Sequence, residues 1–210
     1  MAGAGGLRIG IRAESFDAAK RQLESIGRKI DPVLRGALDT TAVEVRKRRY
    51  TPAIAQMFKG RSFVNKRILV KRVNRRKGRF DARLIPSSAG VYVTEYRKWG
   101  FIPITPTRAR IIVGSFKGHK VAAGFVNPAS FGRQPWRTRS EKERKLKKAP
   151  KFDQRTSYRY QTPLEAAIGP SVAFFFKRMT NAATLKYANQ RVQQEFQRRL
   201  RKELLKGAAS

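Results

Sequence analysis

Residues 80–93 read FDARLIPSSAGVYV, and the spacing of the apolar residues changes at this stretch. Phe80, Ala82 and Leu84 alternate with other residues, which is typical of a strand with one buried face. More apolar runs follow as far as Val126, and glycine and proline residues separate them. The pattern predicts a small antiparallel sheet between Phe80 and Val126.

Helical spacing dominates the chain before this stretch. A short strand is expected over residues 7–11, where apolar residues alternate with Arg or Gly. Over residues 16–30 the apolar residues recur every three or four positions, which predicts a helix with Ser15 as its N-cap. Asp31 and Pro32 predict the N-cap and the first turn of a second helix.

The C-terminal part of the chain carries a long helical pattern from Val172 to about Lys206. Its apolar stripe consists of Val172, Phe175, Phe176, Met179, Ala183, Val192, Phe196, Leu200 and Leu204. These patterns predict an α+β fold in one domain spanning residues 1–210. In it, N-terminal helices and a long C-terminal helix pack on a small antiparallel sheet, and basic arms extend from it.

The charge balance is strongly positive. The chain has 48 Lys plus Arg against 14 Asp plus Glu, for a formal net charge of +34. Such an excess opposes compaction by self-repulsion, so we expect phosphates or carboxylates of partners to relieve it. The apolar content of 40% and the 13 Phe residues still predict a folded core.

Several classes of protein are disfavoured by the composition. The chain has no Cys, which excludes disulfides and Cys-ligated metal sites. The N-terminus has no apolar core of signal-peptide length. The longest clear apolar run, VAFFF at residues 172–176, falls far short of the ~20 residues of a membrane span. We therefore expect a soluble protein that does not act at a membrane.

A basic segment at residues 61–79 is the first candidate site. Residues 63–80 read FVNKRILVKRVNRRKGRF and contain eight Lys or Arg and no Asp or Glu. Val64, Ile68 and Leu69 share a helical face, so the segment is predicted to be an amphipathic helix whose cations flank an apolar stripe. The candidate nucleic-acid-binding residues are Lys66, Arg67, Lys71, Arg72, Arg75, Arg76, Lys77 and Arg79.

A second basic segment lies at about residues 133–160. It has little apolar periodicity, and long loops of this kind are usually functional arms or disordered segments. We expect an arm that becomes ordered against a partner and binds acidic faces of neighbouring subunits. Its candidate residues are Arg137, Arg139, Lys142, Arg144, Lys145, Lys147 and Lys148.

Catalytic constellations are not evident in the sequence. The single histidine, His119, has no carboxylate or cysteine nearby in sequence to orient it as a general base. Glu141 and Glu143 form the one close pair of acids outside the N-terminal helices, and they lie in a basic run where they relieve local charge. We expect no catalytic residues, no metal and no cofactor, and therefore no enzyme.

Sequence-specific reading of nucleic acid is also not indicated. Neither basic segment matches a helix-turn-helix, zinc-finger or RNA-recognition signature. Non-specific contact with phosphates and contact with acidic protein subunits are both compatible with these charges. The residues alone leave the two alternatives open.

The stretch PLEAAIGPSVAFFF at residues 163–176 is similar to a turn found in phage tail-completion proteins of the minor tail protein Z family. The matching positions are Pro163, Leu164, Gly169, Pro170, Ser171 and Val172. The order of parts is also similar: an Ala-rich helix, a basic amphipathic segment, a strand region containing AGFV at residues 123–126, the turn, and a basic final helix.

This resemblance implies a structural virion protein that completes the tail at the head-proximal end, or neck, of a long phage tail and helps to join tail to head. It implies a homo-oligomeric ring, expected to be a hexamer, assembled in the host cytoplasm. The implied partners are tail terminator, tail tube and head–tail connector proteins, together with exiting genomic DNA contacted non-specifically. The alternative from another class is an RNA-binding structural protein of a ribonucleoprotein particle, similar to a ribosomal protein.

Overall fold

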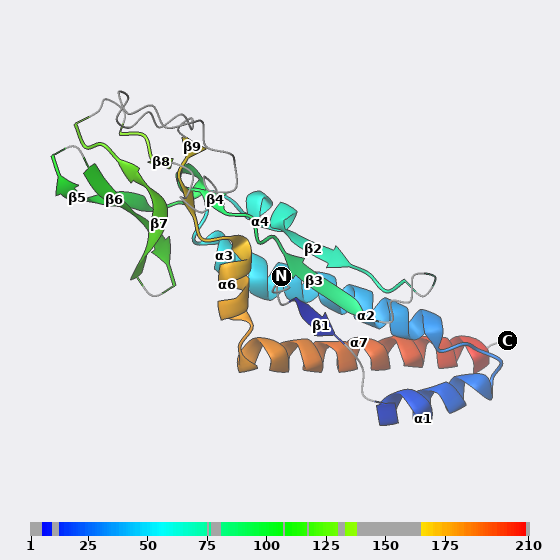
Figure 1. The fold of residues 1–210 in the computed structure, drawn as a ribbon. Helices are drawn as coiled ribbons and strands as arrows, with labels where there is room; N and C mark the ends of the chain where they lie inside the picture. The colour runs from blue at the N-terminus through cyan, green and yellow to red at the C-terminus, as the bar shows by residue number, and fades with distance from the viewer. Residues whose placement is uncertain are drawn as a thin grey trace. The chain divides into compact units, whose positions relative to one another are not determined.

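The structure is a computed structural model, and it describes residues 6–9, 13–74, 76, 81–106, 108–116, 118–129, 133–137 and 165–208. The chain divides into two compact units (Figure 1). Unit 1 comprises Met1–Gln56, Gly60–Ala89 and Ser171–Ser210. Unit 2 comprises Met57–Lys59 and Gly90–Pro170.

Unit 1 contains most of the helices and a short sheet. Its elements are β1 (Leu7–Ile9), α1 (Ala13–Glu24), α2 (Asp31–Val45), a π-helical turn (Arg46–Tyr50), α3 (Thr51–Ala55), α4 (Arg61–Arg67), β2 (Ile68–Lys71), β3 (Ala82–Pro86), α6 (Val172–Met179) and α7 (Ala182–Ala208). The strand predicted near residues 7–11 is therefore confirmed over Leu7–Ile9.

The sheet of unit 1 has the strand order β1-β3-β2, and both pairs are antiparallel. Its inner face is formed by alternate residues of each strand, and β3 shows the pattern most clearly, since Ala82 and Leu84 are fully buried. Ile9 of β1 and Ile68 of β2 are buried in the same way. The inner face packs on α2, and β2 and β3 run along this helix in Figure 1.

Helices α2 and α7 make the most extensive helix–helix contact in unit 1, and α1 packs against α7. Their shared core consists of Ala19, Leu23, Ile30, Val33, Ala37 and Phe196, with Phe16, Leu200 and Leu204 packed against it. Apolar residues at three- and four-residue spacing supply this core, as expected for amphipathic helices. Burial of these side chains is the main source of stability in the unit.

Both predicted N-caps are wrong, because each of the two residues lies inside its helix and not before it. Helix α1 already begins at Ala13, so Ser15 lies inside it. Helix α2 begins at Asp31, and its N-cap is Ile30 without a side-chain capping bond. Asp31 and Pro32 instead occupy the first turn, where a carboxylate is favoured by the helix dipole and proline loses no helical hydrogen bond.

The C-terminal pattern forms two helices instead of one. Helix α6 ends at Met179, and the Thr180 hydroxyl donates a hydrogen bond of 2.9 Å to the carbonyl oxygen of Phe176. Asn181 then caps α7, because its side-chain oxygen accepts a bond of 2.9 Å from the backbone N–H of Thr184. The interruption shifts the buried stripe, so Thr184 is buried and the predicted Ala183 is exposed.

Unit 2 is built mainly from strands. Its elements are β4 (Val91–Tyr92), a 3-10 turn (Val93–Glu95), β5 (Trp99–Thr105), β6 (Arg108–Ser115), β7 (Gly118–Val126), β8 (Trp136–Arg137), β9 (Glu165–Ala166) and β10 (Ile168–Gly169). The main strand order is β4-β10-β7-β6-β5, while β8 pairs with β7 and β9. The predicted α+β class is confirmed, although the strands form two sheets where one was expected.

Gly124 of β7 is needed for the packing of β8 and β10 around it. It has φ +143°, and a Cβ at this position would lie 2.3 Å from the carbonyl oxygen of Trp136 and 2.7 Å from Cβ of Ala167. Neither approach is possible for a residue with a side chain. Two hydrogen bonds of 2.9 Å hold Ala167, whose N–H donates to Pro135 and whose carbonyl accepts from Val93.

Candidate nucleic-acid interface

The predicted basic segment at residues 61–79 does not form one helix. Helix α4 ends at Arg67, and residues 68–71 form strand β2, which pairs with β3. The helix prediction is correct over residues 61–67 and wrong over residues 68–71. The run ILV at residues 68–70 contains two β-branched residues, and pairing with β3 buries Ile68 completely, which favours the strand.

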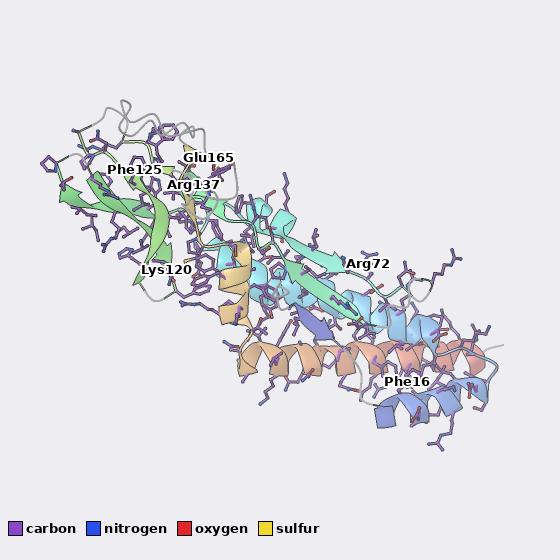
Figure 2. All side chains as sticks on the ribbon, in the orientation of Figure 1. Phe16, Arg72, Lys120, Phe125, Arg137 and Glu165 are labelled. Carbon is purple, nitrogen blue, oxygen red and sulfur yellow. The ribbon has the colours of Figure 1, made fainter. Side chains whose placement is uncertain are left out.

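The change from helix to strand separates the predicted cations. Lys66 is exposed near the end of α4, and the Arg67 guanidinium lies over the ring of Phe63, 4.5 Å from its centroid. Lys71 is exposed at the end of β2. Arg72 and Arg76 are exposed beyond the strand, and Figure 2 shows Arg72 at this end of the sheet. Arg75, Lys77 and Arg79 lie outside the described residues.

The sheet register brings the positions of three basic residues, one on each strand, into one row. Lys71 of β2 stands opposite Arg83 of β3, and Arg83 stands opposite Arg8 of β1. Lys71 and Arg83 alternate with the buried residues of their strands, so they belong to the outer face of the sheet. We call Arg8, Arg83 and Lys71 the cation row.

One carboxylate neutralises part of this row. Nε of Arg83 donates hydrogen bonds of 3.0 and 2.8 Å to the two carboxylate oxygens of Asp81. This pairing raises the pKa of Arg83 above its ordinary value. Lys71 stands directly opposite Arg83, and the Asp81 carboxylate reduces the repulsion between these two like charges.

The chain beyond β2 is held in place by a bond to α2. The backbone N–H of Val73 donates to Oδ1 of Asp39 at 2.8 Å, and Val73 is buried. At the other end of β2, Nη1 of Arg46 donates a hydrogen bond of 3.2 Å to the carbonyl oxygen of Ile68. Arg72 therefore follows a stretch of backbone that is hydrogen-bonded at both ends.

Carboxylates of unit 1 are used inside the contact between α2 and α7. Glu44 of α2 forms an ion pair of 3.0 Å with Arg48 and accepts a hydrogen bond of 2.5 Å from Nε of Arg191 on α7. The hydrogen bond with Glu44 raises the pKa of Arg191. These carboxylates balance cations within the fold.

Glu195 is the most buried of these carboxylates, with 2% of its side chain exposed. Arg198 and Arg199 donate to it, and the bond from Arg198 is the main reason that its pKa lies below the ordinary value. Arg199 also donates to the Thr40 hydroxyl at 3.0 Å. Its guanidinium lies where α2 has Gly36, since a Cβ there would be 2.3 Å from Nη1.

The last turns of α7 present a second group of outward cations. Arg201 and Lys202 are exposed beside Gln194 and Gln197, and these residues line a shallow surface depression. Arg198, Arg199 and Arg191 of the same helix are engaged by the carboxylates just described. Helical spacing in the sequence does not distinguish the two groups, because the partners lie on α2 or one turn away.

The cation row contains two residues that the sequence reasoning missed, Arg8 and Arg83. The sequence did contain a strand signal for both residues, because each alternates with apolar residues: Arg8 in LRI and Arg83 in ARLI. What the sequence could not supply is the register, which places both in line with Lys71.

The predicted arm at about residues 133–160 is described only at its start, residues 133–137. Arg137 of β8 forms an ion pair with Glu165 of β9, with 2.5 Å between Nη2 and Oε2 (Figure 2). The two residues are also cross-strand partners. Arg137 and Glu165, the described residues on either side of positions 138–164, are therefore adjacent in the sheet. The other candidates of the arm, Arg139, Lys142, Arg144, Lys145, Lys147 and Lys148, lie outside the described residues.

The turn on which the family resemblance depends makes structural contacts. The hydroxyl of the buried Tyr96 donates to the carbonyl oxygen of Pro170, and burial raises the pKa of Tyr96. Gly169 ends β10 opposite Val91. Ser171 is the N-cap of α6, and its side chain accepts from the N–H of Phe174. Pro163 lies outside the described residues.

His119 is exposed in β7, opposite Gly114 of β6. Within the described ranges, no group of three or more His, Asp or Glu side chains is placed to hold a metal ion. No helix in the same part of the chain is both long and apolar enough to cross a bilayer.

Comparison of the chain with family models, with curated proteins and with solved structures finds no match.

Proposed function

We propose that the chain is a structural virion protein that completes the tail at the head-proximal end of a long phage tail and contacts the exiting DNA without reading its sequence. The observation that carries the DNA contact is the cation row together with the exposed Lys66, Arg72 and Arg76. The resemblance of residues 163–176 to the minor tail protein Z family supports the place in the tail.

The spacing of the row suits a duplex. Neighbouring strands lie about 4.8 Å apart, so the three positions span roughly 10 Å. Duplex DNA carries one phosphate charge per about 1.7 Å of its axis, so several phosphates lie within reach of one row. Binding would release the counterions of these phosphates.

A ring would multiply this effect. In a hexamer, six copies of the row surround the DNA and hold its end by charge alone, in the virion and at the neck of the tail. Neighbouring tail terminator, tail tube and connector proteins are the proposed protein partners. The basic arm at residues 133–160 is the proposed clamp on their acidic faces.

A binding experiment with purified chain tests the interface. Four exposed cations are changed in the test variant: Lys66→Gln, Lys71→Gln, Arg72→Gln and Arg76→Gln. A matched control makes the same change of charge at other exposed positions of unit 1: Arg21→Gln, Lys29→Gln, Lys47→Gln and Lys186→Gln. Affinity for a random-sequence duplex is measured as a function of salt.

If all four residues contact phosphates, the slope of log affinity against log salt should become shallower by about 3.6 in the test variant. The control should keep the slope of the unchanged chain. If the test variant and the control lost the same affinity for the duplex, binding would depend on net charge and not on this surface, and the interface would be refuted.

Electron microscopy of particles tests the place in the tail. Particles carrying the test variant should have tails of normal length but impaired placement of the DNA end. Failure of tails to form at all would contradict the DNA role. Co-purification of the unchanged chain with RNA in place of tails would instead favour the ribonucleoprotein alternative.

A further inference from the structure

Strands β5, β6 and β7 of unit 2 have an outer face that is separate from the cation row. By register, Gly100, Ile112 and Val121 form one cross-strand position on this face. Ile102, Arg110 and Phe125 form the next position, and Figure 2 shows Phe125 on β7. We call these six residues, with the bulged Ile104, the β5–β7 face.

The β5–β7 face exposes large aliphatic side chains. Ile102 is 53% exposed, Ile104 57% and Val121 55%. A single exposed aliphatic residue is ordinary, but a group on neighbouring strands forms a patch of the kind that marks an interaction site. The other face of the same strands is used for the core, since Ile111 and Val113 of β6 are fully buried.

The charged residues within and between these three strands are all basic. No Asp or Glu occurs between Glu95 and Glu141, a stretch that contains all three strands. Arg110 lies within the face, and Arg108 is exposed on the same strand. An occupant that complements the face must therefore combine apolar side chains with carboxylates or another anion.

We infer that the β5–β7 face is a docking site for an acidic protein subunit with an apolar centre. Aliphatic groups such as Ile102 and Val121 gain nothing from phosphates, and nucleic-acid platforms use exposed aromatic rings, whereas Phe125 is half-buried. A second copy of this chain is disfavoured by charge, because the same stretch without carboxylates would face it. Burial of the aliphatic side chains supplies affinity, and the arginines select an acidic partner.

Docking occurs on the face and not along the edge of the sheet. Strand β5 is the last strand in the sheet order, but it contains Pro103 and has an irregular register between Pro103 and Thr105. Proline has no N–H to donate, and bulges and prolines on edge strands oppose pairing with another strand.

Site-specific photo-crosslinking in cells that assemble the particle tests this assignment. Benzoylphenylalanine is introduced at Ile102 or Val121, and at the exposed Leu185 of α7 as the control. The expected product is an adduct with one protein, identified by mass spectrometry, whose crosslinked peptide contains carboxylates next to apolar residues. Adducts with DNA, with a second copy of this chain or with a basic protein would overturn the inference, as would no adduct beyond the Leu185 control.

Binding of the purified chain to the purified crosslinked protein is then measured by calorimetry. The double variant Ile102→Ser, Val121→Ser should weaken binding about tenfold or more. Arg110→Glu, which keeps both aliphatic residues, should also weaken it. Unchanged affinity in both variants would refute the docking site. Duplex DNA affinity, which depends on unit 1, should be unaffected, so failure here is distinguishable from failure of the proposed DNA contact.

Discussion

Replacement of Gly124 by alanine tests how unit 2 holds strands β7 and β8 together. The backbone at Gly124 has φ +143°, which residues with a side chain rarely adopt. The new Cβ would also lie 2.3 Å from the carbonyl oxygen of Trp136, which is a backbone atom and cannot rotate away. The strand β8 or the sheet around it would have to shift.

The magnitude follows from these two effects. A strained backbone conformation costs about 1–3 kcal/mol, and overpacking in a filled site costs about 1–3 kcal/mol. Alanine lowers the entropy of the unfolded chain, which offsets about 0.4–1 kcal/mol. We expect Gly124→Ala to lower the free energy of unfolding of unit 2 by about 1–5 kcal/mol.

Tryptophan fluorescence during urea unfolding measures this change directly. The chain has two Trp residues, Trp99 and Trp136, and both belong to unit 2. The urea midpoint of the fluorescence transition should fall by roughly 1–3 M. Circular dichroism at 222 nm, which is dominated by the helices of unit 1, should show a smaller change.

Gly100→Ala is the matched control in the same sheet. Its Cβ would have Ile112 as its nearest neighbour at 3.9 Å, an ordinary contact. We expect a change of no more than about 0.5 kcal/mol. If Gly124→Ala were as stable as Gly100→Ala, the close approach of β7 and β8 would be wrong.

Three further predictions concern the packing of unit 1 and the arm. Glu195→Gln should lower stability by about 1–2 kcal/mol at pH 7, measured by urea unfolding. Two arginines, Arg198 foremost, hold the pKa of Glu195 below its ordinary value. The contribution of Glu195 to stability is therefore complete above about pH 4.5 and is lost as pH falls through the folded-state pKa, so the difference in stability between the two proteins should disappear in acid. A difference in stability that does not depend on pH would contradict the pairing. Tyr50→Phe removes the hydrogen bond of 3.0 Å to the Thr180 hydroxyl but keeps the ring stacked on Phe176, so the free energy of unfolding should fall by about 1 kcal/mol. A fall of more than about 3 kcal/mol would show that the Tyr50 hydroxyl contributes more than this one hydrogen bond. Replacement of residues 138–164 by Asn-Gly should give a two-residue hairpin that leaves the fluorescence transition intact but blocks incorporation into tails, and normal incorporation would reject the clamp.

The elements of the fold could be predicted where local pattern and tertiary contact agree. Alternation in ARLIP and the glycine-separated runs after it placed the strands between Phe80 and Val126 correctly. Helical spacing identified buried residues of the C-terminal stripe, such as Phe175, Val192 and Phe196. In these segments one face of the helix or strand is apolar, and that face is buried in the core.

The prediction failed where a distant segment decides the outcome. Residues 63–73 have a helical apolar pattern, but β3 is available to pair with Ile68–Lys71, and the strand buries Ile68 completely. The cation row was likewise invisible, because Arg8 and Lys71 are far apart in sequence and meet only through the register with Arg83. A break at Thr180 and Asn181 could have been predicted, since Asn is a favoured N-cap.

The missing side chain at Gly36 has a consequence for how this sequence can change. Glycine in the middle of a helix costs about 0.5–1 kcal/mol relative to alanine, and here the vacated space holds the guanidinium of Arg199. Positions 36 and 199 therefore form a coupled pair. Relatives with alanine or a larger residue at 36 should carry a shorter side chain at 199.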